Sequence, residues 1–510
     1  MRVSLRWLRR WVPCLSGDID AIGDALLSLG FPVESVEMVG IPAKHLHVGK
    51  IIQFEQHPRG DRLRICQVDV GEEVPRQIVC GANNFFQEDH VAVALPGCRM
   101  PDGTVIKVAD FRGVRSHGMM CSGRELGISQ DGEGLLILEK EIPIGTAVSL
   151  LFPELSDVSF DLEITSNRGD CMSHLGIARE LAAYYNLNLA VCPENLPLSF
   201  ADEGEKEQFG STLRIQCDCE ECTQFIAWEV RGVTVKESPQ WLRDDLEHIG
   251  VRPVNNVVDV TNWLLADCGQ PLHAFDKDKI HGGYLYIRRA YEGEKMVAID
   301  HRSYALQGDM MVVCDSQKPL AIAGIMGSVD GEVDEDSKNL ILESAAFAAE
   351  SIQCTARKLG IVSGAAQRFS RGIDEAYVHI CAKKAVQMLE QICGGEAATE
   401  PAVFSRGGEK MEKKTISIDG EFVRKKLGKN VADEEIENVL RRLYFQPQGR
   451  DGHWQVFVPS FRAHDVCTSI DLLEEFIRLY GIHQLPLGDV LMRAIYGEDD
   501  ESFQFQRRVG

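Results

Sequence analysis

Residues 39–150 differ in pattern from the rest of the chain. Apolar and polar residues alternate there in short runs, and glycine, proline, asparagine and aspartate separate the runs. The clearest runs are "HVGKIIQFEQ", "LRICQVDVG" and "HVAVALPGC". A period of two is typical of short strands joined by turns, and several such strands in one segment predict a small β-barrel. The flanking segments have helical spacing instead, so we expect the chain to fold as several units.

Changes of composition predict where these units begin and end. With 510 residues the chain is longer than one ordinary domain, and we expect a multidomain α+β protein with the barrel inserted in an N-terminal α/β segment. The expected units are an N-terminal segment at 1–38, the barrel at 39–150, a continuation of the N-terminal domain with a polar linker at 151–209, a mixed α+β block at 210–400, a third block at 411–488, and the start of another module at 489–510. Because the chain stops within what reads as a new helix, we expect it to be part of a longer protein.

Helical spacing locates the main helices. At the N-terminus Leu5, Leu8 and Trp11 or Val12 recur at this spacing, and further helices are expected at 175–186, 350–360 and 374–393. The third block reads strand, helix, helix, β-ribbon and helix, an order typical of a winged-helix-like module.

Composition excludes several classes of protein. Hydrophobic residues make up 44% and charged residues 26%, and no run approaches the roughly 20 apolar residues of a membrane span. A net charge of −23 argues against a non-specific polyanion binder. Sixteen cysteines without a secretory signal predict reduced thiols in a cytoplasm. Cys217, Cys219 and Cys222 have zinc-like spacing, but a second CxxC is missing, so we do not expect a metal there.

Basic side chains gather in two segments of the expected barrel. They are Arg59, Arg62 and Arg64 in one segment and Arg112 and Arg115 in the other. Such a face can follow a phosphate backbone by charge and shape. The alternative is a solvated surface, because Asp61, Glu72 and Glu73 lie in the same segment.

Acidic side chains gather in the third block. Asp471, Glu474 and Glu475 follow the spacing i, i+3, i+4 and share one helix face, and Asp465 lies just before them. Hard oxygen ligands suit Mg²⁺ or Ca²⁺. The alternative is structural, since Thr468 and Asp471 have the spacing of a capping box.

Polar residues interrupt an apolar stretch at 255–276. Thr261, Asn262 and His273 lie there among valine, leucine and tryptophan, and a buried polar group without a partner costs about 1–3 kcal/mol. One interpretation is the lining of a polar pocket. The other is that Thr261 and Asn262 cap a helix beginning at Trp263, with His273 a satisfied core residue.

Several motifs resemble known domains. "VGKIIQFEQHPRGDRLRICQVDVG", "QIVCGANN" and "GVRSHGMMCSGRELGI" resemble the tRNA-binding OB-fold domain of several tRNA synthetases, although Gly60-Asp61-Arg62 replaces the usual Ala-Asp-Lys. "VVDVTNWLLADCGQPLHAFD", "LILESAAF" and "GAAQRFSRGID" resemble the B3/B4 editing domain of the bacterial phenylalanyl-tRNA synthetase beta subunit, and 459–486 resembles its B5 domain. The order of these segments resembles that beta-subunit family throughout.

The resemblance implies site residues. Thr261, Asn262, His273 and Glu343 would line a pocket that cleaves tyrosine from mischarged Tyr-tRNA(Phe), with Gly324, Ser363 and Ala365 in its walls. Ser363 stands where some relatives have threonine. Asp465, Asp471, Glu474 and Glu475 would bind Mg²⁺, and Arg59, Arg62, Arg64, Arg112 and Arg115 would contact tRNA. Arg168 and Asp170 belong to a further signature, which we interpret as a structural turn with hydrogen-bonding partners.

The resemblance also implies a reaction and partners. The family joins phenylalanine to tRNA(Phe) with ATP and Mg²⁺ in a cytoplasmic α₂β₂ enzyme whose aminoacylation centre, with its ATP, is on the alpha subunit. The chain has no GxxxxGK[ST] loop, so we expect it to bind tRNA and edit, but not to charge tRNA alone. The alternatives are a non-enzymatic tRNA-binding scaffold with an inert pocket and a free-standing editing factor.

Overall fold

The computed structural model describes eight stretches of the chain. They are residues 1–16, 18–41, 45–60, 62–128, 134–152, 156–190, 209–406 and 414–486. The expected linker at 193–209, apart from its last residue, and the expected module start at 489–510 lie outside them, as does Asp61.

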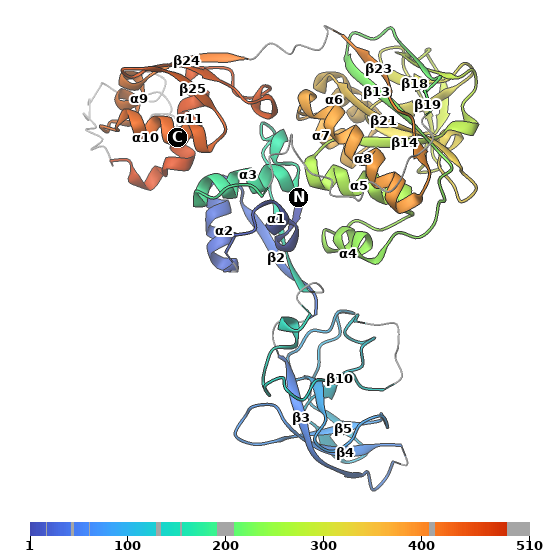
Figure 1. Ribbon diagram of the computed structural model, residues 1–510, viewed down its shortest axis with the longest axis vertical. Helices are drawn as coiled ribbons and strands as arrows, with labels where there is room; N and C mark the ends of the chain where they lie inside the picture. The colour runs from blue at the N-terminus through green and yellow to red at the C-terminus, as the bar shows by residue number, and fades with distance from the viewer. Residues whose placement is uncertain are drawn as a thin grey trace, which may run out of the picture.

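A three-stranded antiparallel sheet joins the two parts of the N-terminal domain. Its order is β1 (Arg2–Ser4), β11 (Ser156–Leu162), β2 (Val33–Gly40), with Val3 opposite Phe160. Helices α1 (Leu5–Trp11), α2 (Ile19–Ser28) and α3 (His174–Tyr185) pack around it. Because β11 returns between β1 and β2, the residues between β2 and β11 form an insertion, which lies apart from the remaining chain in Figure 1.

The inserted region is an antiparallel β structure. The path of its main sheet is β10 (Ile137–Leu138), β6 (His90–Ala94), β3 (Leu46–Gln56), β4 (Arg64–Asp69), β5 (Arg76–Cys80), with β9 (Met119–Met120) also paired to β6. Every residue of β6 is buried, because Val91 and Val93 face one apolar cluster while Ala92 and Ala94 face another. A hairpin of β7 (Ala109–Phe111) and β8 (Val114–Ser116) packs beside β5.

Two sheets form the middle block. The first has β14 (Leu272–Asp276), β21 (Asn339–Phe347), β13 (Cys222–Arg231) and β22 (Glu396–Ala397), with β23 (Ala402–Ser405) also on β13. The second has β12 (Arg214–Cys217), β15 (Tyr284–Arg289), β18 (Met311–Cys314), β19 (Pro319–Ile322) and β20 (Met326–Gly327). A small hairpin of β16 (Lys295–Val297) and β17 (Ser303–Ala305) completes the strands of this block.

Helices cover one face of the first sheet. α5 (Asn256–Cys268) packs on β14 and on α8 (Val378–Cys393), and α8 packs on β21 and β13. α4 (Gln240–His248) lies against α5, and α6 (Ala349–Leu359) contacts α7 (Gly364–Phe369). The expected helix at 350–360 is therefore present, and the one at 374–393 begins only at Val378, after a 3₁₀ turn at Glu375–Tyr377.

The C-terminal block has the element order expected from sequence. It contains β24 (Thr415–Asp419), α9 (Gly420–Leu427), α10 (Asp433–Arg442), β25 (Gln446–Arg450), β26 (His453–Phe457) and α11 (Ser469–Tyr480), and its sheet runs β24-β26-β25. Figure 1 shows the N-terminal helices lying between this block and the middle block. Arg442 donates to the carbonyl oxygens of Ala183 and Tyr184, which fixes the block to α3.

The N-terminal helix is fixed to the middle block by its tryptophans. The indole nitrogens of Trp7 and Trp11 donate to the same carboxylate oxygen of Asp267, at 2.8 and 2.9 Å, and Lys384 donates to the other oxygen at 2.7 Å. None of the helices in the described ranges combines the length and the apolar character that crossing a membrane requires.

Candidate functional site

His273 and Glu343 lie directly opposite each other on neighbouring strands. β14 and β21 pair antiparallel with His273 in register with Glu343, so their side chains leave the same face of the sheet. The next residue of β21, Ser344, points to the other face, where its hydroxyl donates to the carbonyl of Val378 at the start of α8. Glu343 and His273 therefore face away from the helices and toward the second sheet, where Gly327 lies against the His273 ring.

Both side chains keep polar atoms that lack a protein partner. Among the residues that the structure describes, Nε2 of His273 and Oε2 of Glu343 are buried without a hydrogen bond. Burial raises the pKa of Glu343 to about 8 and lowers the pKa of His273 to about 4. At neutral pH the carboxyl is therefore protonated and can donate a hydrogen bond, and the imidazole is uncharged and can accept one at the ring nitrogen that carries no hydrogen.

Two glycines of one loop are closely packed, and one of them contacts His273. A Cβ at Gly327 would lie 2.6 Å from Cε1 and Nε2 of His273, so the ring occupies the space that any other residue would fill. Gly324 has φ +68°, and a Cβ there would come within 3.0 Å of Ile352, Phe347 and Phe369. Gly324 was expected from the resemblance; Gly327, three residues later in the same "AGIMG" run, was missed.

Ser363 connects the glycine loop to α7. Its hydroxyl donates to the carbonyl of Ile325 at 2.8 Å and accepts from the amide of Ala366 at 3.0 Å, as the N-cap of the helix. Ala365 is half-buried in the first turn. The structure thus brings the expected wall residues Gly324, Ser363 and Ala365 together in one contact region.

Thr261 and Asn262 lie inside α5 and do not begin a helix. Asn255 is the N-cap, with its side chain accepting from the amides of Val257 and Val258, so the interpretation of a helix starting at Trp263 is wrong. The Thr261 hydroxyl donates to the carbonyl of Val258 at 2.7 Å, which satisfies it within its own helix. Asn262 is half-buried. Within the described residues, neither of these two side chains forms a hydrogen bond with His273 or Glu343.

The four acids proposed as magnesium ligands are not gathered into one site. Arg462 donates twice to Glu475, at 2.6 and 2.8 Å, and also donates to Asp465. Glu474 is exposed. Asp471 forms the capping box with Thr468, which is the structural alternative named above. A guanidinium already occupies the place of a cation between two of these carboxylates, so they do not fit a metal in this arrangement. The magnesium prediction rests on the resemblance alone.

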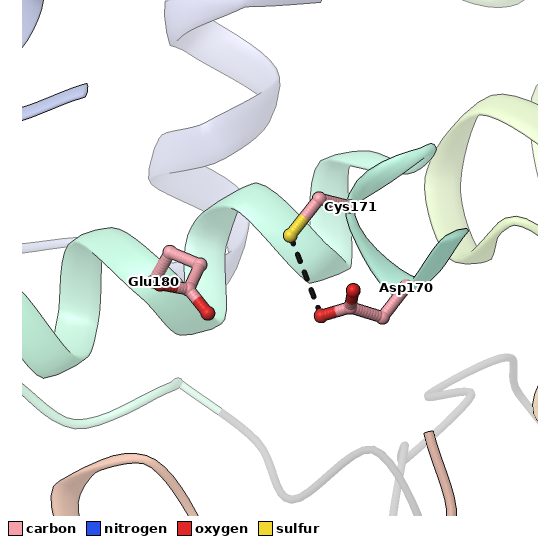
Figure 2. Close-up of side chains that lie close together, drawn as sticks. All are labelled: Asp170, Cys171 and Glu180. Carbon is pink, nitrogen blue, oxygen red and sulfur yellow. Dashed lines mark hydrogen bonds between the residues drawn. The ribbon is translucent and has the colours of Figure 1, made fainter. Parts of the chain in front are cut away.

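One group of ligand-type atoms is found elsewhere within the described ranges. Asp170, Cys171 and Glu180 place a sulfur and two carboxylate oxygens within 4.8 Å of one another (Figure 2). However, Nη2 of Arg168 contacts all three, at 2.8 Å from Asp170, 3.0 Å from Cys171 and 2.6 Å from Glu180. The positive charge there is a side chain, as expected from the turn signature, and the cluster is an ion-pair site.

This cluster extends into the C-terminal block. Arg478 donates to Glu180 at 2.5 Å and to Glu475 at 2.6 Å, and Glu475 in turn accepts from Arg462. We name the series Asp170, Arg168, Glu180, Arg478, Glu475, Arg462, Asp465 the charge chain. Acids and bases alternate along it from α3 to α11. The sequence offered no signal for this pairing, because its two halves lie about 300 residues apart.

The charge chain shifts the pKa values of its members in a consistent way. Burial alone would raise the pKa of Asp170, but Arg168 and Arg462 outweigh it and bring that pKa down to about 2. The pKa of Glu475 is lowered in the same way by Arg462 and Arg478. Asp465 is the last member of the charge chain. Its burial outweighs the effect of Arg462 and raises the pKa of Asp465.

The two basic segments of the inserted region lie side by side. His57 and the carbonyl of Phe111 are 2.8 Å apart, and Arg112 donates to the carbonyl of Arg59 at 2.6 Å. The guanidinium of Arg64 covers the rings of Phe54 and Phe85, at 5.0 and 5.2 Å. The side chains of Arg59, Arg62, Arg112 and Arg115 are exposed. Four of the five arginines are thus exposed to solvent, and two of them, Arg59 and Arg112, lie close together.

Three family models match the chain. They are the putative tRNA binding domain at residues 46–147, the B3/4 domain at 221–394 and the tRNA synthetase B5 domain at 416–482. His273 and Glu343 fall within the second range, and the five arginines of the inserted region fall within the first.

The chain is also similar to curated proteins along its length. It is 36% identical to the phenylalanine-tRNA ligase beta subunit of Fusobacterium nucleatum subsp. nucleatum, with 100% of this chain and 62% of that protein covered. It is 37% identical to the corresponding subunit of Syntrophus aciditrophicus, with 96% and 60% covered. The chain therefore spans about three-fifths of the length of these relatives.

A solved structure shows a weaker likeness. An N-terminal fragment of the phenylalanyl-tRNA synthetase beta subunit from Pyrococcus horikoshii is 16% identical with a TM-score of 0.34, covering 64% of this chain and 87% of that one.

Proposed function

The chain is related to the beta subunits of phenylalanine-tRNA ligase, at 35–39% identity over at least 94% of its length, and on this premise we propose that its middle block hydrolyses Tyr-tRNA(Phe). The observation that supports this proposal is that Glu343 and His273 lie opposite each other and that each has a buried polar atom without a hydrogen-bond partner. A polar pair of this kind is costly in a site that binds nothing, because each unsatisfied group costs about 1–3 kcal/mol.

The pair is matched to a phenol. Tyrosine differs from phenylalanine by one hydroxyl, which can donate one hydrogen bond and accept another. In the proposed complex the protonated carboxyl of Glu343 donates to the phenol oxygen, and the phenol donates to Nε2 of His273. Phenylalanine would leave both groups unsatisfied, so the pocket would discriminate against the correctly charged tRNA.

Hydrolysis takes place at the other end of the tyrosyl group. Water adds to the ester carbonyl, the bond to the ribose oxygen breaks, and that oxygen leaves with a proton. Binding the phenol fixes the position of the ester, which accounts for the part of Glu343 and His273 in the rate. Thr261 and Asn262 are assigned to the ester end on the resemblance alone.

The other blocks supply binding. We propose that residues 39–150 form an OB-fold barrel that contacts tRNA(Phe) through its arginines, and that the winged-helix-like block at 411–488 contributes to an α₂β₂ assembly with an alpha subunit in the cytoplasm. The aminoacylation centre, with ATP and Mg²⁺, is assigned to alpha. Purified chain without alpha should therefore show no ATP-pyrophosphate exchange, and robust exchange would contradict this assignment.

Deacylation of mischarged tRNA tests the editing proposal. We expect Glu343→Ala and His273→Ala to slow release of tyrosine from Tyr-tRNA(Phe) by at least about tenfold, since each removes one of the two hydrogen bonds to the phenol. Glu350→Ala is the matched control, because Glu350 is exposed on the neighbouring α6. If both variants deacylate Tyr-tRNA(Phe) as fast as the control, the chain is a scaffold with an inert pocket. Equal rates on Phe-tRNA(Phe) and Tyr-tRNA(Phe) would exclude the phenol assignment.

A further inference from the structure

Two cysteines from distant parts of the sequence meet beneath the first sheet of the middle block. Cys268 is the last residue of α5, and Cys381 lies in the first turns of α8. Their sulfur atoms are 2.9 Å apart although the residues are 113 positions apart in the chain. A disulfide bond needs sulfurs about 2.05 Å apart, so the two helices already hold the thiols close to bonding position.

The hydrogen bonds of the pair give each thiol a defined orientation. The Cys268 thiol donates to the carbonyl of Leu264 at 3.1 Å, one turn earlier in α5. Each thiol carries a single hydrogen, so the contact between the sulfurs is made by the Cys381 thiol donating to Cys268. The Cys268 sulfur is thereby held with its lone pairs toward Cys381.

The two sulfurs differ in access. Cys381 is fully buried, while Cys268 is half-buried and lines a hollow with Gly169, Asp170, Gln270, Tyr377 and Phe461. The hollow has a volume of about 30 Å³, which admits one or two molecules the size of water but excludes a bulky thiol. A small oxidant can therefore reach Cys268 first.

The surroundings of the two sulfurs also differ. Lys384, which is ion-paired to Asp267, and Arg368 both lie within electrostatic range of the Cys268 sulfur. Burial raises the pKa of Cys381 well above its ordinary value, which keeps that residue a thiol until its partner has reacted.

We propose that Cys268 and Cys381 form a disulfide when the protein meets hydrogen peroxide or another small hydroperoxide. In the first step the Cys268 sulfur bonds to a peroxide oxygen and the O–O bond breaks; the thiol proton goes to the leaving oxygen, which departs as water or, from an organic hydroperoxide, as an alcohol, and a sulfenic acid remains. The Cys381 sulfur then attacks the Cys268 sulfur, the S–O bond breaks, and the hydroxyl leaves as water with the proton of the Cys381 thiol. The two sulfurs lose two electrons in total, and the peroxide gains them.

The bond would join α5 to α8 five residues before His273. It closes a long loop, and a crosslink of this kind stabilises the folded chain mainly by restricting the unfolded one. The oxidised chain should therefore unfold at a temperature several degrees higher than the reduced chain. The proposal does not depend on the editing activity.

Peptide mapping of the full chain tests the proposal directly. After peroxide treatment that oxidises exposed Cys354, followed by alkylation and trypsin, the peptides 244–277 and 372–383 should appear as one species, lighter than their sum by two hydrogens. Each of these peptides contains a single cysteine, so the assignment is unambiguous. Recovery of both peptides in alkylated form under the same treatment would overturn the proposal.

A matched pair of variants provides the second readout. Cys268→Ser should abolish the peroxide-induced rise in unfolding temperature, and a strong reductant should reverse that rise in the wild type. Cys393→Ser is the control, because Cys393 is also buried and lies on the same helix as Cys381. If Cys268→Ser keeps the full rise, another pair of thiols is responsible and the assignment is wrong.

Discussion

Two buried sets of titratable groups in this protein are arranged in opposite ways. In the charge chain every carboxylate meets at least one guanidinium, and the pKa values of Asp170 and Glu475 are lowered accordingly. In the candidate site Glu343 and His273 have no such partner. Burial raises the pKa of Glu343 and lowers the pKa of His273, and both shifts favour the uncharged form of the side chain. The first arrangement holds two blocks of the chain together, whereas the second leaves hydrogen-bonding capacity for a ligand.

The largest expected effect comes from breaking the charge chain at its central base. Arg478→Met leaves Glu180 and Glu475 with one guanidinium each, and breaking a buried ion pair of this kind costs about 3–5 kcal/mol. The free energy of unfolding of the C-terminal block, measured in denaturant, should fall by that amount. Arg441→Met is the control, since Arg441 forms an exposed ion pair worth less than about 1 kcal/mol. Equal losses in both variants would show that the charge chain does not join the blocks.

A pair of carboxylates on the same guanidinium sharpens the comparison. Glu475 has a lowered pKa and Asp465 a raised one, although both accept from Arg462. Glu475→Gln should therefore cost about 2 kcal/mol of unfolding free energy at neutral pH, and Asp465→Asn less than about 1 kcal/mol. Denaturant unfolding of the two variants side by side measures the difference. The reverse order would contradict the assignment of Asp465 to the weak end of the chain.

The unpartnered pair predicts a dependence of stability on pH. Burial raises the pKa of Glu343 from 4.5 to about 8, so its contribution to stability is fully present below pH 4.5 and is lost as the pH rises toward 8. His273, lowered from 6.5 to about 4, contributes stability above pH 6.5 that is lost as the pH falls toward 4. Between pH 6.5 and 8 only Glu343 changes, so the wild type should lose about 1.4 kcal/mol per pH unit relative to Glu343→Gln. Denaturant unfolding of both proteins at pH 6.5 and 8 provides the measurement, and parallel pH profiles would mean that Glu343 has a partner.

The smallest expected effect concerns the acid that backbone amides satisfy. Asp471 accepts from the amides of Cys467 and Thr468 at 2.8 and 2.7 Å, and the Thr468 side chain caps α11. Thr468→Ala should lower the free energy of unfolding by about 1 kcal/mol, as loss of an N-cap does.

Added Mg²⁺ should leave the melting temperature of chelator-treated protein unchanged. A rise that Asp471→Asn abolishes would restore the magnesium site to these carboxylates.

Local features of the fold could be predicted because their causes are local. The strand, helix, helix, ribbon, helix order of the C-terminal block follows from periodicity, and the ends of α8 and α5 follow from Gly394 and Gly269. The start of α5 was misjudged, since the capping side chain of Asn255 lies before a valine-rich run that reads equally well as a strand. Period alone does not separate these two cases.

The candidate site could be predicted only through resemblance. Periodicity does not show that His273 is in register with Glu343, because strand pairing joins residues 70 positions apart in the sequence. The acids at 465–475 show a second limit of periodicity. The helical spacing of Asp471, Glu474 and Glu475 suits a metal site, but Arg462 pairs with Glu475 and with Asp465 before the helix, and a single sequence does not reveal which cation meets which acid.

The alternation of the charge chain limits how the domains of this protein can be exchanged with those of a relative. Arg478 is shared between a carboxylate of its own block and one of the N-terminal domain, so a transplanted C-terminal block would arrive with an arginine that fits only a host carrying an acid at the position of Glu180. A chimera that breaks this correspondence would bury an uncompensated charge at the new junction. Functional hybrids should therefore be obtained when the transplanted segment contains both halves of the charge chain, or neither half.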